Sequence, residues 1–152
     1  MRKVLTKNFL PKLKQIQLLL YSLIIFFLAV ICLIIIPFPS ATKRQLLPFL
    51  AVFSLAFFVL GAILLFLTLK TKTINPKFKK FLILTGASSV GFLLSVLLHN
   101  FLYALSVLVQ HVSLLHNLAE FLHATFFIIG IFIYPIVFVV GIIGSIIQLR
   151  HQ

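Results

Sequence analysis

Acidic residues are almost absent from this sequence, in which Glu120 is the single acidic side chain among 152 residues. Lys and Arg are also absent from 81–149, a tract of 69 residues. Charged residues make up 9% of the chain and hydrophobic residues 62%, whereas a soluble domain carries about 25% charged residues. So few charged groups cannot cover a surface exposed to water. The composition therefore excludes an ordinary soluble globular protein.

Cysteine is nearly absent as well, with Cys32 as its one occurrence. A single cysteine can form no internal disulfide, and it excludes the paired-thiol chemistry of membrane oxidoreductases. We expect Cys32 to be a small, soft side chain within the helix core.

Long apolar runs are what the sequence does contain. Uncharged stretches cover 15–42, 45–69 and 81–149, and a membrane-spanning helix needs about 20 apolar residues. The last tract is long enough for two passes. The sequence therefore predicts an all-α protein, an integral membrane four-helix bundle that forms a single membrane domain over 1–152. The predicted helices cover approximately 16–36, 46–69, 81–109 and 118–148.

Basic residues predict the orientation of these helices. Five precede the first helix, two lie between the first and second, five lie between the second and third, and Arg150 follows the last. Cytoplasmic loops carry an excess of Lys and Arg, so both termini are predicted to be cytoplasmic in a multi-pass protein of the cell membrane. The predicted partners of the basic loops are the bilayer's anionic lipid headgroups. The net charge of +12 does not indicate nucleic-acid binding, because aromatic and basic residues are not interleaved.

Polar and small residues form a stripe along one face of each of the last two predicted helices. In the third helix the stripe contains Thr85, Ser88, Gly91, Ser95, His99, Tyr103 and Ser106. In the fourth it contains Glu120, His123, Gly130, Tyr134, Gly141, Ser145 and Gln148. Unpaired polar groups in hydrocarbon are costly, so neither stripe is expected to face lipid. Close helix packing through small residues and hydroxyls explains both stripes; the alternative is a polar cavity or solute path between the helices.

Glu120 has a structural and a chemical interpretation. Asn117 and Glu120 have the spacing of a capping box, in which Asn117 is the N-cap and Glu120 reaches back to it. A carboxylate at a helix N-terminus is also favoured by the helix dipole. The chemical alternative is a metal site that draws on Glu120, His123 and His116, with His99 or His111 as further ligands. A role in coupling a proton or solute is the third interpretation.

Membrane histidines also serve as haem ligands, and His99 and His123 are the pair to test. If the third and fourth helices are aligned at Lys80 and Arg150, the two histidines lie about 12 Å apart along the helix axes. This offset disfavours one haem between them within a single chain. Ligation across a subunit interface stays open. We predict no catalytic residue and no resident cofactor.

Several short motifs carry a resemblance. They are Gly86-Ala87-Ser88-Ser89-Val90-Gly91-Phe92, Leu98-His99-Asn100 with Tyr103, Phe126-Phe127, Pro135, and Gly141-Ile142-Ile143-Gly144-Ser145-Ile146. In these motifs the chain resembles a family of small uncharacterised bacterial multi-pass membrane proteins. The resemblance covers the last two helices and implies a multi-pass membrane protein, with no activity to transfer.

The function expected from these observations is that of a non-enzymatic membrane component: a subunit, an assembly partner, or a small homo-oligomer. One alternative is a transport or proton-coupled protein that uses a polar path between the third and fourth helices. The second alternative is a metal- or haem-binding redox subunit.

Overall fold

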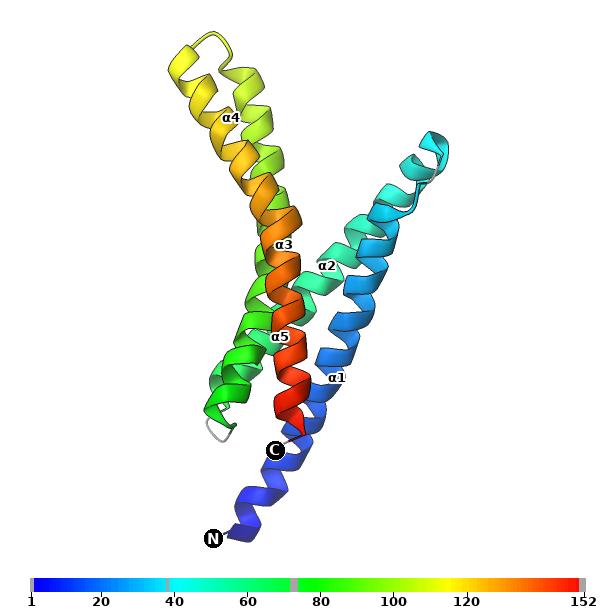
Figure 1. Cartoon of the computed structure of the whole chain (residues 1–152), viewed down its shortest axis with the longest axis vertical. Coiled ribbons are helices and arrows are strands. Elements are labelled where there is room, and N and C mark those ends of the chain that lie inside the picture. Colours follow the sequence, from blue (N-terminus) through cyan, green and yellow to red (C-terminus); the bar gives the residue numbers. More distant parts are fainter. Residues whose placement is uncertain (1, 38, 72–73, 151–152) are drawn as a thin grey trace.

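A computed structural model describes residues 2–37, 39–71 and 74–150, and every regular element within them is helical. Four long helical rods run in alternating directions (Figure 1). The elements are α1 (Arg2–Ile35), α2 (Ser40–Lys70), α3 (Pro76–Leu108), α4 (Ser113–Ile128), a π-helical turn η1 (Ile129–Ile133) and α5 (Tyr134–Leu149). The last three form one continuous rod that pairs with α3.

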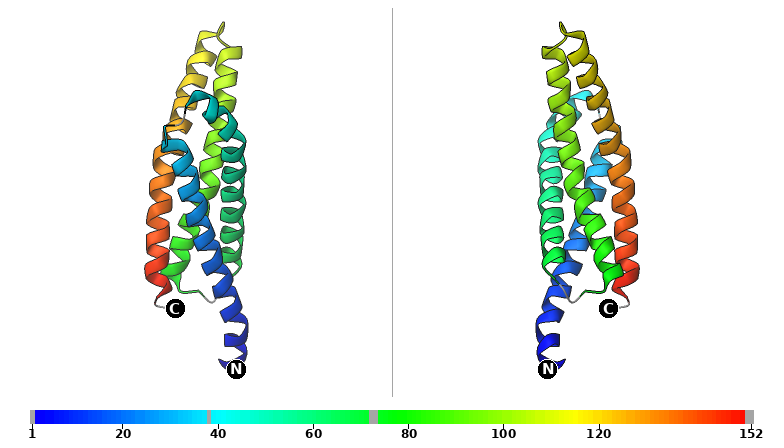
Figure 2. Two further views of the ribbon diagram at one scale, coloured as in Figure 1. Left: turned by 90° about the vertical axis from the view of Figure 1, so that its right-hand side faces the viewer. Right: turned by 90° about the vertical axis from the view of Figure 1, so that its left-hand side faces the viewer.

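The rods form two hairpins that share one end. α1 packs on α2, α2 packs on α3, and α3 packs on α4, η1 and α5. The N- and C-terminal ends lie at the same end of the molecule, and from there the α1–α2 and α3–α4 hairpins diverge into a V (Figure 1). Figure 2 shows that the α3–α4 hairpin also extends beyond the turn that joins α1 to α2.

The four predicted spans correspond to four helices that are long and apolar enough to cross a membrane. These segments are Pro11–Leu33, Gln45–Lys70, Pro76–Leu108 and Ser113–Leu149. The ends of the helices agree closely with the prediction, but every helix starts earlier than predicted. In the first three helices the backbone hydrogen bonding extends beyond the apolar runs into the basic residues that precede them, because Lys, Arg and Gln are good helix formers. In α4 the extension covers 113–117, which holds no Lys or Arg.

Asn75 and Pro76 explain why α3 begins where it does. The Asn75 side chain accepts a hydrogen bond of 2.9 Å from the backbone N–H of Lys77, which satisfies one of the unpaired donors at the helix start. Pro76 occupies the first helical position, where its missing N–H costs nothing. α3 therefore starts before the predicted boundary at 81 and reaches 33 residues.

The π-helical turn ends two residues before Pro135. The backbone N–H of Tyr134 bonds to the carbonyl of Ile129, five residues earlier, whereas an α-helix would use the carbonyl of Gly130, four residues earlier. Proline lacks an N–H, and its ring crowds the carbonyl four residues before it. The wider turn accommodates this ring without breaking the rod.

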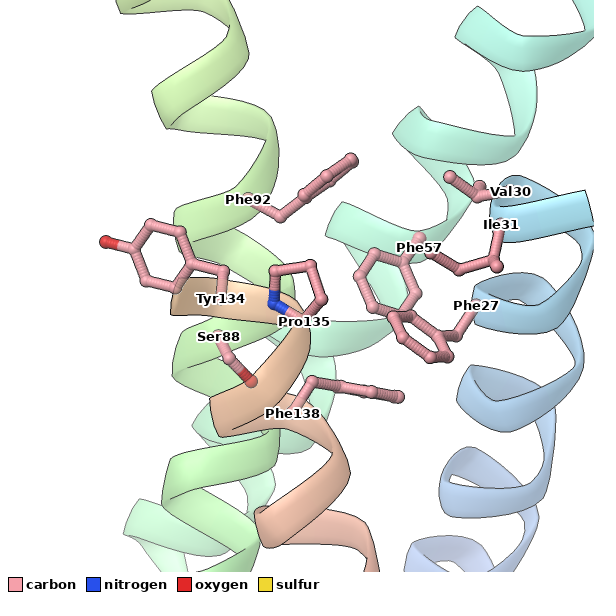
Figure 3. Close-up of a pocket in the computed structure, with 9 residues that line it drawn as sticks. All are labelled: Phe27, Val30, Ile31, Phe57, Ser88, Phe92, Tyr134, Pro135 and Phe138. Carbon is pink, nitrogen blue, oxygen red and sulfur yellow. The ribbon is translucent and has the colours of Figure 1, made fainter. Parts of the chain in front are cut away.

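Aromatic side chains join the two hairpins partway along the rods. The ring of Phe138 on α5 lies 4.6 Å from that of Phe27 on α1 and 5.0 Å from that of Phe57 on α2, centroid to centroid. Figure 3 shows these rings converging with Phe92 and Pro135. The space left between them is about 10 Å³, which admits one water at most. The junction is thus packed by side chains and holds no ligand-sized cavity.

Most apolar side chains outside these contacts are exposed. Leu18 is 69% exposed on α1 and Phe66 63% exposed on α2. Cys32 is exposed too, so the expectation that it belongs to the core is wrong. The residues around Cys32 are uniformly apolar, and such a segment does not show which of its faces is packed.

Candidate functional site at the α3–α4 hairpin

The two polar stripes lie against each other along the contact between α3 and the α4–η1–α5 rod. A Cβ on Gly141 would lie 2.6 Å from Thr85 Oγ1 and 2.9 Å from the Thr85 backbone nitrogen. A Cβ on Gly91 would overlap the Tyr134 ring, and one on Gly130 would lie 3.3 Å from Ser95 Cβ. Glycine at these positions lets the two backbones approach closely. The part of both stripes nearer the termini is a tight helix contact.

The hydroxyl groups in this contact bond mostly within their own helix. Thr85 Oγ1 donates to the Phe81 carbonyl at 2.9 Å, and Ser88 Oγ donates to the Leu84 carbonyl at 2.8 Å. Thr85 and Ser88 therefore do not form the expected bonds between hydroxyls across the contact, and they need no solute or water to be satisfied. The buried Oγ of Ser145 has no hydrogen-bond partner among the described residues.

Glu120 meets α3 near the tip of the hairpin. Ser106 Oγ donates to Glu120 Oε1 at 2.6 Å and has the Tyr103 carbonyl as a second acceptor at 2.9 Å. Ser106 is fully buried, whereas the Glu120 side chain is 43% exposed. A hydrogen bond to a carboxylate is among the stronger ones in proteins. This bond ties α4 to α3 across the hairpin.

Two histidines add further bonds across the same hairpin. His116 Nδ1 lies 3.0 Å from the Ser106 carbonyl oxygen, and His99 Nδ1 lies 3.1 Å from the His123 carbonyl oxygen. A carbonyl oxygen can only accept, so both Nδ1 atoms must carry the proton and donate. His123 Nδ1 is buried without a hydrogen-bond partner in the described part of the chain and lies 3.8 Å from Glu120 Oε2.

The imidazoles of His99 and His123 stack on each other. Their ring centroids are 4.4 Å apart with 20° between the planes, and Tyr103 and Phe127 flank the pair at 5.4 Å and 5.1 Å. The predicted 12 Å offset is therefore wrong. Contacts such as Gly141 on Thr85 set Arg150 opposite the start of α3 rather than opposite Lys80. Rings stacked face to face do not present nitrogens to opposite sides of a haem.

The capping prediction for Asn117 and Glu120 is also wrong. α4 begins at Ser113, with Val112 in the N-cap position and no side-chain cap bond. Asn117 is exposed in the second turn, where the backbone donors already have helical partners. Glu120 bonds to Ser106 instead of reaching back. The capping pattern misled because the helix already runs through the residues before Asn117.

The donors considered for a metal are not arranged to hold an ion together. Among the described residues, no group of three or more His, Cys, Asp or Glu side chains is placed to hold an ion. Glu120 and His123 are neighbours. His99 and His116 donate from Nδ1 to backbone carbonyls, and His111 is exposed at the tip. A structural zinc site needs about four protein ligands. No set of donors of that size is assembled among the described residues of the hairpin.

Two features of the structure are not predicted from the sequence: the pairing of Ser106 with Glu120 and the role of Gly61. The spacing of Ser106 from Tyr103 and His99 places it on the stripe, and that stripe could have indicated a partner on the facing helix. A Cβ on Gly61 of α2 would collide with Ser89 on α3. The available signal was the pair Gly86 and Ser89, one helical turn apart, which offers a small-residue surface to α2.

The hairpin thus holds a carboxylate, three imidazoles and a serine in one cluster: His99, Ser106, His116, Glu120 and His123. Comparisons of the chain with models of protein families, with curated proteins and with solved structures find no match.

Proposed function

We propose that this chain is an integral protein of the cell membrane with both termini in the cytoplasm, and that it serves as a non-enzymatic subunit or assembly partner. Four apolar helices and the common end of the two termini (Figure 1) support insertion with an even number of passes. Lys70, Lys77, Lys80 and Arg150 belong to this same end, and an excess of basic residues favours the cytoplasmic side.

The observation that carries the proposal is the outward face of the α3–α4 hairpin. Leu108 is 72% exposed and Leu114 77% exposed on either side of its tip, although polar groups such as Ser106 and Glu120 bond inside the hairpin. A groove of about 190 Å³ on this hairpin is lined by Leu102, Leu105, Val109, Leu115, Leu118, Ala119 and Leu122. Exposed apolar surface of this extent marks an interaction site.

Helix length explains why lipid does not suffice to cover the tip. α3 has 33 residues, which is about 50 Å of helix, whereas the hydrocarbon core of a bilayer is about 30 Å thick. A tilt of about 20°, the average for spanning helices, shortens this only slightly. With the basic residues at one surface, the tip reaches the opposite headgroup region or beyond. Its leucines then need another protein chain, a second copy or a different membrane protein, as their neighbour.

Site-specific photo-crosslinking in native membranes tests this proposal. A photo-reactive amino acid replaces Leu114 at the tip or, as a matched control, Leu18 on α1, which is exposed to a similar extent. We expect a discrete protein adduct from position 114, identified by mass spectrometry, and only lipid adducts from position 18. Lipid adducts alone from both positions would contradict an assembly role for the hairpin.

A proton-coupled function is the second candidate, favoured by the buried, unpartnered Nδ1 of His123 beside Glu120. Between this pair and the end with the termini, Gly91 packs tightly on Tyr134 and Gly130 on Ser95. These contacts leave little room for a proton path between the two helices, which favours the assembly role. Proton flux into liposomes decides between them. Wild type and Glu120→Gln should both leave the flux at the level of empty liposomes; a wild-type flux abolished by Glu120→Gln would support transport instead.

A further inference from the structure

A pocket between α1 and α2 lies at the opposite end of the molecule from the histidine cluster. Its volume is about 180 Å³, many times the ~10–15 Å³ that admits one water. Lys12, Gln15 and Lys70 form its polar rim, and Ile16, Phe66 and Leu67 form its apolar floor. The pocket combines two cations and an amide donor with a hydrocarbon surface.

The two lysines of this pocket have no acidic side chain as a partner. Glu120, the chain's single acidic side chain, is bonded to Ser106 at the far tip of the α3–α4 hairpin. The Lys70 ammonium lies 5.6 Å from the centroid of the Phe66 ring, a cation–π position that holds it at the pocket edge. Both lysines line the pocket, and an anion bound between two ammonium groups offsets their mutual repulsion.

The apolar floor decides which kind of anion fits. Ile16 is 1% exposed at the bottom of the pocket, whereas Phe66 is 63% exposed and continues onto the outer face of α2. A phosphate bound by the lysines would direct any attached hydrocarbon chain along Phe66. Thr71 adds no donor, because its hydroxyl donates to the Leu67 carbonyl at 2.7 Å.

We propose that this pocket binds the phosphate of one anionic phospholipid from the adjacent leaflet, with Lys12 and Lys70 on the phosphate, Gln15 as a neutral donor and an acyl chain along Phe66. The proposal rests on the membrane insertion proposed above and not on the assembly role of the hairpin. Basic pockets between spanning helices on the cytoplasmic side are known headgroup sites in membrane proteins.

Native mass spectrometry of the full chain tests the lipid site. Protein from nanodiscs of phosphatidylcholine mixed with phosphatidylglycerol is released, and the retained lipids are counted and identified. Lys12→Gln/Lys70→Gln is compared with Lys14→Gln/Lys77→Gln, which removes the same charge from exposed positions at the same end that do not line the pocket. Equal thermal unfolding of the two double variants shows that both are folded.

We expect wild type and Lys14→Gln/Lys77→Gln to retain one phosphatidylglycerol selectively, and Lys12→Gln/Lys70→Gln to bind it about tenfold more weakly. An equal loss in both double variants would overturn the proposal, because it would show a general surface attraction. The absence of any selective retention by wild type would overturn it as well.

Glycerol 3-phosphate distinguishes a lipid headgroup from a free phosphate ester. Displacement of the lipid by glycerol 3-phosphate at an equal concentration would also overturn the proposal, since the site would then serve a soluble ligand. Crosslinking at Leu114 tests the other end of the molecule. The lipid-site proposal and the assembly proposal can therefore be contradicted independently.

Discussion

Glu120 illustrates what a single residue does in this protein. Its carboxylate accepts a hydrogen bond from Ser106, and Ser106 in turn offers its carbonyl to His116. The most conspicuous charge in the sequence therefore fastens two helices together. Both groups of the bond lie close to the tip, where water competes less inside the hairpin than on its exposed face.

The Ser106–Glu120 bond predicts a coupled loss of stability. Ser106→Ala and Glu120→Ala should each lower the free energy of unfolding by about 1 kcal/mol, and the double variant should lose little more, because either change alone removes the bond. Chemical unfolding in mixed micelles measures all three variants. Asn117→Ala is the control and should change stability by less than about 0.5 kcal/mol, since Asn117 is exposed and caps nothing. Additive losses would contradict the bond.

Two glycines on the same rod should respond differently to alanine. Gly141→Ala places a Cβ against the backbone of Thr85, which cannot move aside, and overpacking should cost about 1–3 kcal/mol. Gly130→Ala meets only Ser95 Cβ at 3.3 Å. There the gain in helix propensity, up to about 1 kcal/mol, should offset the contact. Thermal unfolding in detergent measures both, and equal destabilisation would argue against close packing at Gly141.

At the scale of helices, the rods are joined by two different kinds of contact. Glycine and serine join α2, α3 and α5, whereas aromatic rings join α1 to α5. In a bilayer, lipid tails are as apolar as leucine, so association depends on close packing and hydrogen bonds. Interlocked rings provide that packing where no glycine allows the backbones to approach.

Phe138 is the ring that brings α5 against α1 and adds to the contact between α2 and α3. Phe138→Ala removes the partner of both Phe27 and Phe57 and should lower stability by about 3 kcal/mol. Phe132→Ala is the matched control, because Phe132 is 56% exposed on the same rod and should change stability by less than about 0.5 kcal/mol. Thermal unfolding compares them. Similar effects of the two changes would contradict a stabilising role for the aromatic contact between α1 and α5.

At the scale of the whole molecule, the V-shaped arrangement (Figure 1) places the two proposed binding sites, the lysine pocket and the leucine groove, at opposite ends. The end with both termini carries most of the basic residues and the lysine pocket, and the far end of the α3–α4 hairpin carries the histidine cluster and exposed leucines. We propose that the first end binds lipid headgroups and the second a protein partner.

The proposed topology predicts which ends a membrane-impermeant thiol reagent reaches in intact cells. In a Cys32→Ser background, Gln110→Cys at the hairpin tip should be labelled from outside. Lys77→Cys, at the start of α3, should be labelled only after the cells are permeabilised, because its end carries the excess of basic residues. External labelling of Lys77→Cys would reverse the orientation.

How much of this could be predicted depended on the kind of signal. Apolar length predicted four helices, and helical periodicity predicted both polar stripes, because each is a property of one segment. The prediction of a cap at Asn117 was wrong because a capping pattern inside a longer helix has no free backbone donors to satisfy. The prediction that Cys32 is a core residue was wrong because the sequence of an evenly apolar helix does not show which of its faces is packed.

The amino-acid sequence by itself determined that the chain is helical and apolar enough to cross a membrane four times, since composition and run length control both. Only the tertiary structure decided what Glu120 does, where His99 stands relative to His123, and which lysines share a pocket. These outcomes depend on the register between α3 and its partner rod and on the angle between the hairpins. Glycine contacts and aromatic rings from distant segments set both, and no single segment encodes them.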